Sequence, residues 1–252
     1  MATFAVGDIH GHLEPLADLL QQLRPQLASG DTLVFLGDYI DRGPDSRACV
    51  DAILAVRQET SADVVCLRGN HEDWMLQTRA DYCRHSWLLG MDGLDTVQSY
   101  SADAFETLRM AMAVERGRLY SETVRLPYEL FFDALPSEHV DFFDELRTCH
   151  GTSECICAHG GVDPAVASLE DQPRRALIWG ASGFPQQYRG DQVVVYGHWN
   201  NATLDANGWP SPLILGNTIG IDTIGFGVLT AIRLPDRRVF QSALYQSAVR
   251  DD

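Results

Sequence analysis

The stretch TFAVGDIHGH, residues 3–12, begins with an apolar run that ends in a glycine and an aspartate. Two similar runs follow, because Thr32–Leu36 leads into Gly-Asp and Asp63–Leu67 leads into Arg-Gly-Asn-His. Apolar residues at helical spacing occupy both intervals between these runs. The first 72 residues are therefore predicted to form a βαβαβ unit, in which right-handed crossovers make the strands parallel neighbours.

Polar side chains follow each of these predicted strands. They are Asp8 and His10, then Asp38 and Asp41, then Asn70 and His71. Parallel strands place their carboxyl ends along one edge of a sheet, which is where ligand sites form in open α/β sheets. Two later apolar runs also end in histidine beside glycine, at His159 and His198. We therefore expect these clusters, distant in sequence, to converge.

The rest of the chain shows two further patterns. Residues 73–147 are mostly helical in pattern, which predicts a helical insertion covering the sheet within a single domain spanning residues 1–252. Short apolar runs then predict strands at Cys155–Ala158, Leu177–Trp179, Gln192–Tyr196, Ile219–Asp222, Val228–Arg233 and Val239–Ala243. These strands are expected to form a second sheet, mixed or antiparallel, and residues 208–216 are predicted to form a surface loop.

Composition excludes several classes of partner. The formal net charge of −16 disfavours binding to nucleic acid and to anionic membrane surfaces. No apolar run is long enough to span a membrane, and the N-terminus lacks the pattern of a signal peptide. The six cysteines form no CxxC pair, so Cys155 and Cys157 are expected to be small buried hydrophobes. These features favour a cytoplasmic protein.

The strand-end side chains include two carboxylates, three imidazoles and one amide, from Asp8, His10, Asp38, Asn70, His159 and His198. One metal in an open catalytic site cannot use all of them, whereas two metals can if one carboxylate bridges the pair. Two cations ~3.5–4 Å apart promote phosphate ester hydrolysis because they neutralise negative charge and lower the pKa of the attacking water. Mixed nitrogen and oxygen ligands suit manganese, iron or zinc. Two divalent metal ions are expected, with manganese first and iron or zinc as alternatives.

Three blocks in order resemble the signature of the phosphoprotein phosphatases within the calcineurin-like metallophosphoesterase superfamily. They are GDIHG (7–11), GDYIDRG (37–43) and RGNHE (68–72), and HGG (159–161) and GH (197–198) match the later metal blocks. The sequence is most similar to the bacterial and lambda-type phage serine/threonine phosphatases. The likeness extends to HSWLLGMDG (85–93), LPSEHVDFF (135–143), LIW (177–179) and 219–232, and therefore covers nearly the whole chain.

This resemblance implies an α+β fold, a four-layer α/β/β/α sandwich of two mixed sheets packed face to face, with a dinuclear metal site at the carboxyl edge of the strands. Asp8 and His10 would hold the first metal and Asp38 would bridge. Asn70, His159 and His198 would complete the second. A metal-bridging hydroxide would attack phosphorus in line.

The resemblance also implies roles for residues around the metals. His71 would protonate the leaving oxygen, and Asp41 would orient its imidazole. Arg42 and Arg68 would bind phosphate, although Arg68 alternatively pairs with a nearby acid and only shapes its loop. The position of His12 varies among relatives, so the resemblance gives it no ligand role.

The sequence departs from the family pattern near the expected mouth of the site. Relatives usually carry a phosphate-binding arginine just after the tryptophan of the LIW block, whereas Trp179 is followed here by Gly-Ala-Ser-Gly. Arg174, Arg175 and Arg189 flank this stretch and are candidates to replace it. His198 is followed by Trp199 and Asn200, where relatives have Thr-Pro. Weaker phosphate binding than in relatives, or a substrate with other contacts, is expected.

Three functions are compatible with these features. The leading prediction is a metal-dependent serine/threonine protein phosphatase acting on phosphorylated proteins or peptides. The second is a symmetrical dinucleoside polyphosphate hydrolase acting on diadenosine tetraphosphate, a sister group that tends to lack the aspartate corresponding to Asp41. The third is an inactive scaffold that recognises phosphorylated partners. The sequence does not determine the oligomeric state, and a monomer is compatible with it.

Overall fold

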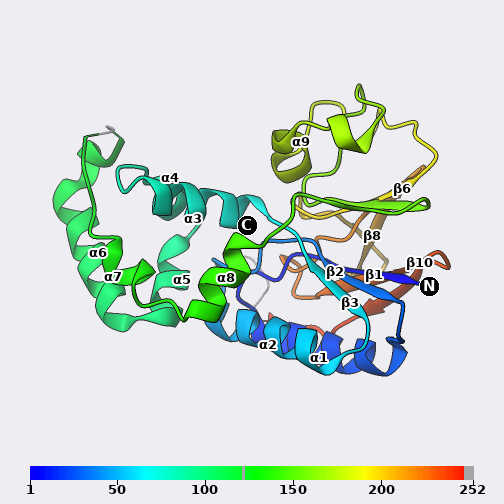
Figure 1. Cartoon of the computed structure of the whole chain (residues 1–252), viewed down its shortest axis with the longest axis horizontal. Helices are drawn as coiled ribbons and strands as arrows, with labels where there is room; N and C mark the ends of the chain where they lie inside the picture. Colours follow the sequence, from blue (N-terminus) through cyan, green and yellow to red (C-terminus); the bar gives the residue numbers. More distant parts are fainter. Residues whose placement is uncertain (121–122, 247–252) are drawn as a thin grey trace.

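The computed structural model describes residues 1–120 and 123–246 and contains two β-sheets with helices around them (Figure 1). The first sheet has five strands in the order β11-β10-β1-β2-β3. They are β1 (Thr3–Val6), β2 (Thr32–Phe35), β3 (Asp63–Cys66), β10 (Thr230–Leu234) and β11 (Arg238–Gln241). As predicted, β1, β2 and β3 are parallel, whereas β10 runs antiparallel to both β1 and β11.

The second sheet has six strands in the order β4-β5-β6-β9-β8-β7. They are β4 (His150–Gly151), β5 (Cys155–Cys157), β6 (Val193–Tyr196), β7 (Ala202–Leu204), β8 (Pro210–Leu215) and β9 (Thr218–Gly220). The central strands β5, β6 and β9 are parallel, and the other neighbours are antiparallel. This sheet is therefore mixed.

Several predicted elements of the C-terminal half were wrong. The run Leu177–Trp179 belongs to helix α9 (Arg174–Trp179), because a short apolar run has no periodicity that separates a strand from a buried helical turn. The loop predicted at 208–216 is mostly strand β8, in which prolines concealed the pattern. The strands predicted at Val228–Arg233 and Val239–Ala243 correspond to β10 and β11, which join the first sheet through pairing with β1.

The two sheets pack face to face through a buried apolar layer. Ala5, Val34 and Val65 of the first sheet share one cluster with Val195 and Ile219 of the second. Cys155 and Cys157 lie in the same layer as free thiols, as predicted. Hydrophobic burial at this interface holds the parallel strands of both sheets in fixed relation.

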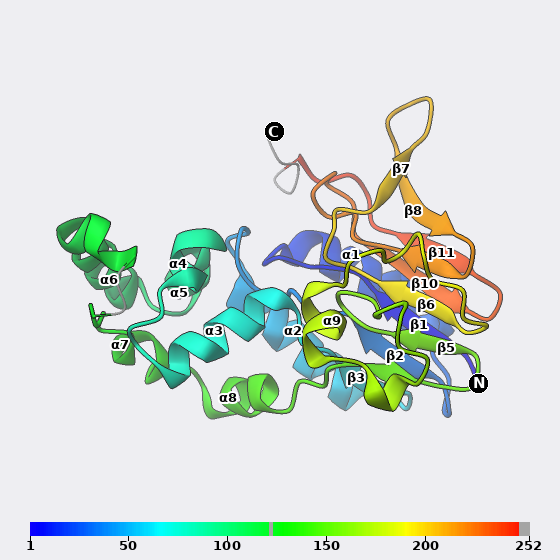
Figure 2. The same cartoon turned by 90° about the horizontal axis from the view of Figure 1, so that it is seen from above.

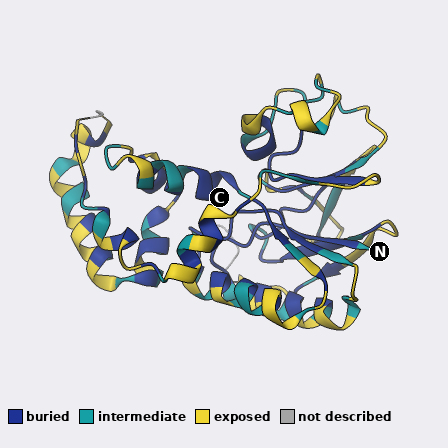
Figure 3. Ribbon diagram, in the orientation of Figure 1, coloured by how far each residue is buried: buried dark blue, intermediate teal, exposed yellow. Residues whose placement is uncertain are grey.

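Helices cover the outer face of each sheet, which gives the four-layer sandwich that was predicted (Figure 1). Helices α1 (Leu13–Leu23) and α2 (Ser46–Glu59) join Phe4 and Phe35 of the first sheet in one apolar cluster. Helix α9 packs Leu177 against Ile156 and Val194 of the second sheet. Buried residues concentrate between the layers, while the outward surfaces of α1 and α2 are exposed (Figure 3).

The segment between β3 and β4 is helical, but it does not cover a sheet face as expected. Its helices are α3 (Asn70–Ala80), α4 (Ser86–Gly90), α5 (Gly93–Tyr100), α6 (Ala102–Glu115), α7 (Glu129–Phe132) and α8 (Ser137–Asp144). The short 3-10 helix η2 (Arg116–Tyr120) also belongs to this segment. The 3-10 helices η1 (Arg24–Gln26) and η3 (Leu169–Asp171) lie elsewhere in the chain. Both views place these α-helices beyond one end of the strands (Figures 1 and 2). They therefore adjoin the strand-end edge where α3 begins.

No helix in residues 1–120 and 123–246 is long and apolar enough to cross a membrane.

Candidate metal centre

The strand-end residues singled out in the sequence converge in the structure. Asp8, Asp38 and Asn70 follow β1, β2 and β3 of the first sheet, and His159 and His198 follow β5 and β6 of the second. The first four are buried and His198 is half-buried. Because the two sheets face each other, their carboxyl ends bring these side chains together from both layers.

The backbone at this edge is held in an uncommon conformation. His10, Asp38 and His198 all have positive φ angles, of 49°, 52° and 72°. Such conformations cost free energy in residues with a side chain, so neighbouring groups must hold them. The backbone amides of Ile9 and His10 donate to the carbonyl of Asp38 at 3.0 and 2.8 Å. These bonds fix the turn after β1 against the turn after β2.

Glu72 joins two of these strand-end loops. Its carboxylate accepts hydrogen bonds from the backbone amides of Asp38, Tyr39 and Gly69 at 2.9–3.0 Å. Burial, followed by the nearby charge of Asp38, raises the pKa of Glu72 to about 8. This role of Glu72 could not be predicted from the sequence, because its contacts to the β2 loop depend on the tertiary fold.

Asp38 lies at the centre of the cluster. Its Oδ2 atom is 3.5 Å from His10 Nε2, 3.4 Å from His159 Nε2 and 3.8 Å from His71 Nε2. Burial opposes ionisation of this carboxyl, but the imidazoles of His159, His71 and His10 hold its pKa below the usual range. Asp38 is thus a charged group shared by imidazoles on two sides, as a bridging ligand would be.

A second group of donor atoms surrounds Asn70. Its Oδ1 atom lies 2.8 Å from His159 Nε2 and 2.7 Å from His198 Nδ1. Burial lowers the pKa of His159, and burial together with His159 lowers that of His198 to about 3. Neutral imidazoles are the form that binds metal.

Asp8 lies beside this group and has an oxygen without a hydrogen-bond partner. Its Oδ2 accepts from the amide of His198 at 2.9 Å, whereas the buried Oδ1 accepts no hydrogen bond and lies 4.0 Å from His159 Nδ1. Burial, then Asp222 and Asp38, raise the pKa of Asp8 well above its usual value. A bound cation would relieve both the unpaired oxygen and the crowding of negative charge.

The donor atoms fit a pair of divalent cations. Two sets lie with all atoms within 4.8 Å of one another, and they share Asp38: one contains His10 and His71, the other His159 and His198. Asp8 belongs to neither set but has a buried oxygen without a hydrogen-bond partner, whereas His71 is held by Asp41 through Nδ1. His10 Nδ1 donates to the Ile40 carbonyl at 3.1 Å, which directs Nε2 to the cluster.

His71 is oriented by a buried hydrogen-bond network. Its Nδ1 donates to Asp41 Oδ2 at 2.8 Å, while its Nε2 faces the cluster without a hydrogen-bond partner. Burial lowers the pKa of His71, but the charge of Asp38 and the bond to Asp41 outweigh it and raise the pKa above its usual value. Trp87 Nε1 and Thr96 Oγ1 also donate to Asp41. Their contribution was missed, because nothing in the sequence links α4 and α5 to the GDYIDRG block.

The two predicted phosphate-binding arginines occupy different environments. Arg42 Nη1 lies 2.5 Å from His10 Nε2, so a metal bound by His10 requires this guanidinium to turn away. Arg68 Nη1 lies 3.9 Å from Asp73 Oδ1, and its buried Nε donates no hydrogen bond. Burial and the neighbouring Arg174 lower the pKa of Arg68. Arg42 thus contacts a residue of the donor cluster, whereas Arg68 pairs with Asp73.

Two other residues clarify the boundary of the centre. His12, for which no ligand role was predicted, occupies the N-cap position of α1. Asp222, which follows β9, is buried close enough to Asp8 to raise its pKa. Its Oδ2 accepts from the amide of Asn200 at 2.5 Å. The sequence analysis missed Asp222, although it lies in a block that resembles the family.

A row of rings borders the cluster. Trp74 and Trp179 lie 4.8 Å apart, Trp179 lies 6.4 Å from His198, and His198 lies 4.3 Å from Trp199, all between ring centroids. We call Trp74, Trp179 and Trp199 the tryptophan row. Arg174 donates to Asp73, and Arg189 donates to nearby carbonyls.

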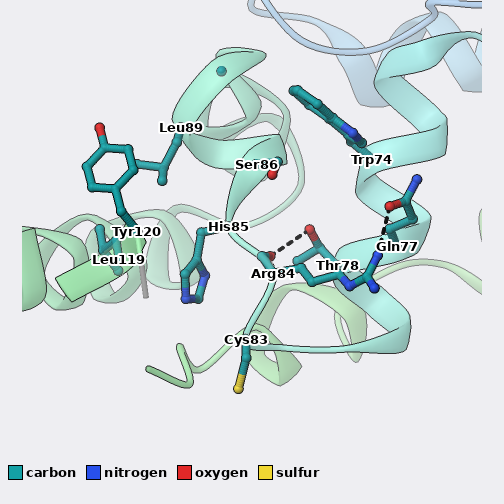
Figure 4. Close-up of a pocket in the computed structure, with 11 residues that line it drawn as sticks. Trp74, Gln77, Thr78, Cys83, Arg84, His85, Ser86, Leu89, Leu119 and Tyr120 are labelled. Carbon is teal, nitrogen blue, oxygen red and sulfur yellow. Dashed lines mark hydrogen bonds between the residues drawn. The ribbon is translucent and has the colours of Figure 1, made fainter. Parts of the chain in front are cut away.

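A cavity of about 560 Å³ adjoins this row in the helical segment (Figure 4). It is lined from α3 by Trp74 and Gln77, from the following loop by Arg84, and from α4 and η2 by Leu89 and Tyr120. Helix α3 starts at Asn70 and rises ~1.5 Å per residue, so Trp74 lies about one turn from the metal centre. Trp74 therefore links the cavity to the tryptophan row through its contact with Trp179.

Comparison with known proteins agrees with this arrangement. A family model for calcineurin-like phosphoesterases matches residues 1–224. A symmetrical bis(5'-nucleosyl)-tetraphosphatase of Janthinobacterium sp. (strain Marseille) is 27% identical over 96% of both chains. Serine/threonine-protein phosphatase 1 of Salmonella typhimurium is 36% identical, but over 54% of this chain and 56% of its own. The protein phosphatase prediction is thus supported at the level of the superfamily, and its substrate class is not.

Solved structures support the fold. A candidate diadenosine tetraphosphatase superposes with a TM-score of 0.59 at 17% identity, over 97% of this chain and 94% of its own. A cold-active protein-tyrosine phosphatase of a psychrophilic Shewanella species gives a TM-score of 0.55 at 15% identity, over 98% and 78%. With the donor cluster at the strand ends and the family match over most of its length, this chain belongs to the calcineurin-like phosphoesterase family.

Proposed function

We propose that this protein is a metal-dependent hydrolase of dinucleoside tetraphosphates such as diadenosine tetraphosphate. One observation carries the reaction class: His10 Nε2 and His159 Nε2 approach the same oxygen of Asp38 to 3.5 and 3.4 Å. A shared carboxylate between two imidazole groups is suited to a dinuclear centre. The substrate class rests on relatives named tetraphosphatases that match along almost the whole chain.

The two cations would be held by six side chains, with Asp38 between them: Asp8, His10, Asp38, Asn70, His159 and His198. When bound, they supply positive charge for the phosphoryl group and lower the pKa of water. Nitrogen and oxygen donors fit manganese, iron or zinc. The buried, unpaired Asp8 oxygen supports their presence in the working protein.

The chain's own residues complete the reaction. His71 holds a proton at Nε2, on the side facing Asp38, and transfers it to the leaving oxygen. Asp41 fixes the ring through Nδ1 and stabilises its protonated form. Arg42 would donate to phosphate oxygens once its guanidinium turns away from His10, and Arg68 would add a weaker contact.

The surroundings of the centre also suit a nucleotide. Small-molecule sites typically occupy about 300–1,000 Å³, and the cavity beside Trp74 has about 560 Å³. A dinucleoside tetraphosphate carries two planar bases, and the tryptophan row offers rings on the side of His198. Arg42 and Arg68 provide local positive charge in a chain whose net charge is −16.

A serine/threonine protein phosphatase is the second candidate. The buried Asp41–His71 hydrogen bond favours it, because a serine alkoxide is a poor leaving group and needs a proton donor more than a phosphate does. The partial similarity to Salmonella typhimurium serine/threonine-protein phosphatase 1 points in the same direction.

The two candidates are separated by a direct assay. The manganese-loaded protein is given diadenosine tetraphosphate and a phosphoserine peptide, and kcat/KM is measured for each, with His71→Asn as the control. We expect the dinucleotide to be preferred by about 10-fold or more, which corresponds to ~1.4 kcal/mol. Release of ADP alone identifies symmetrical cleavage. A higher kcat/KM for the phosphopeptide overturns this assignment in favour of the second candidate.

A further inference from the structure

We propose that the side chain of Trp199 is a stacking platform for a base of the nucleotide substrate. This inference rests on the proposed function for the substrate class and adds a residue that determines specificity. It is carried by the position of the indole beside the metal centre, by its exposure, and by the glycine on which it lies.

Trp199 is placed at the mouth of the centre by its neighbour in sequence. His198 supplies a donor atom to the cluster, and the next residue projects an indole whose ring centroid is 4.3 Å from the imidazole. The rings meet edge to face, at 67°. The Trp199 amide donates to the Gly197 carbonyl at 2.9 Å, which fixes the local turn. The indole therefore lies directly beside a donor residue of the cluster.

The indole lies directly against Gly180. A Cβ at this position would approach Cζ2 of Trp199 to 2.5 Å, and Gly180 also has a φ of +81°. Any larger residue would displace the ring. The two departures from the family pattern, the missing arginine after Trp179 and the tryptophan after His198, are thus in contact and form one feature.

Exposure indicates that the indole has a free surface. Trp199 is 52% exposed, which is unusual for so large an apolar side chain. Trp74 and Trp179 are half-buried and pack on each other, and Trp179 Nε1 donates to Asp73. Within the tryptophan row, Trp199 is therefore the member with a ring available to a ligand.

The loss of an arginine after Trp179, together with an aromatic ring at position 199, changes which ligands this part of the site can recognise. A guanidinium binds any phosphate, whereas an indole face binds a planar base and gains nothing from a bare phosphate chain. Stacking also needs no charge, so it is compatible with a strongly acidic protein. The exchange favours nucleotides over base-free phosphates.

The test measures equilibrium binding to the metal-loaded protein by calorimetry. The probes are a methylene-bridged, non-hydrolysable analogue of diadenosine tetraphosphate and inorganic tripolyphosphate, which has no base. We expect Trp199→Ala to weaken binding of the analogue by about 5-fold or more and to change that of tripolyphosphate by less than about 2-fold. Trp199→Phe should retain most of the affinity. Trp209→Ala, in the β7–β8 hairpin, is the matched control and should bind both probes normally.

The outcomes separate this inference from the proposed function. Unchanged binding of the analogue in Trp199→Ala, or equal weakening for both probes, overturns the platform even if diadenosine tetraphosphate is hydrolysed. Selective weakening in a protein that does not hydrolyse this dinucleotide supports the platform and overturns the proposed function. A phosphopeptide whose affinity falls in Trp199→Ala, while that of the analogue does not, assigns the ring to a protein partner and overturns base stacking.

Discussion

The strand ends and the tryptophan row differ in how strongly the fold constrains them. Asp8, Asp38 and His159 are buried, lie within a network of hydrogen bonds, and come from strands held by two packed sheets. The tryptophan row comes from α3, from α9 and from a loop, and Trp199 is exposed. We therefore expect the strand-end residues to determine the reaction. Substitutions in the tryptophan row are expected to alter which substrate binds.

The largest effect is expected at the shared carboxylate. Asp38→Asn keeps an oxygen that can accept from the His71 amide but removes the charge that both imidazole groups surround. We expect loss of both metals and a fall in kcat/KM of about 1,000-fold or more. Elemental analysis and steady-state kinetics measure the two effects. Asp63→Asn, at the exposed start of β3, is the control, and full activity in Asp38→Asn would place the reaction elsewhere.

A somewhat smaller effect is expected at Asp41. Asp41→Asn keeps one oxygen, which can accept from both Trp87 and Thr96, but it no longer stabilises protonated His71. The rate for an alkyl phosphate should fall by about 100-fold or more, because its leaving oxygen needs the proton. The rate for nitrophenyl phosphate should fall far less, since its leaving group departs without protonation. Equal losses for both esters would show that Asp41 has only a structural role.

Close packing at the strand ends predicts a third effect, on stability. A Cβ at Gly69 would overlap Asp38 Oδ1. Gly69→Ala should reduce the free energy of unfolding by about 1–3 kcal/mol in urea titrations and weaken metal binding. Gly117→Ala meets no atom within 4 Å and should change stability by less than about 0.5 kcal/mol. Similar free energies of unfolding for the two variants would mean that the strand-end loops accommodate the added methyl group at little cost.

The smallest expected effects distinguish the two arginines. Arg42→Ala should raise KM by about 10-fold, as expected for loss of a charge-assisted hydrogen bond to phosphate. Arg68→Ala should raise KM only a few-fold, because Arg68 also pairs with Asp73. Steady-state kinetics with diadenosine tetraphosphate measure both. A larger rise for Arg68→Ala would reverse the assignment of the main phosphate ligand.

The same contrast explains what could be predicted from the sequence. Short apolar runs that end in Gly-Asp are local signals, so β1, β2 and the donors that follow them could be identified. The hairpin of β7 and β8 and the helical turn at 177–179 could not, because prolines and short apolar runs leave the local pattern ambiguous. The placement of β10 in the first sheet depends on pairing with β1, more than 200 residues away in the chain.

The residues that hold the site in place by hydrogen bonds were harder to predict than the donor residues themselves. Glu72, Trp87 and Thr96 act through hydrogen bonds to loops that are distant in sequence. Nothing local distinguishes them from core or capping residues. The contact between Gly180 and Trp199 was visible in the sequence only as two separate departures, and the fold joined them.

The proposed function requires that the strand ends hold two cations with Asp38 between them. Anomalous diffraction from crystals grown with manganese tests it most directly. We predict two peaks, ~3.5–4 Å apart, with Asp38 touching both, Asp8 and His10 on one side, and Asn70, His159 and His198 on the other. A single peak, or peaks away from Asp38, would contradict the claim.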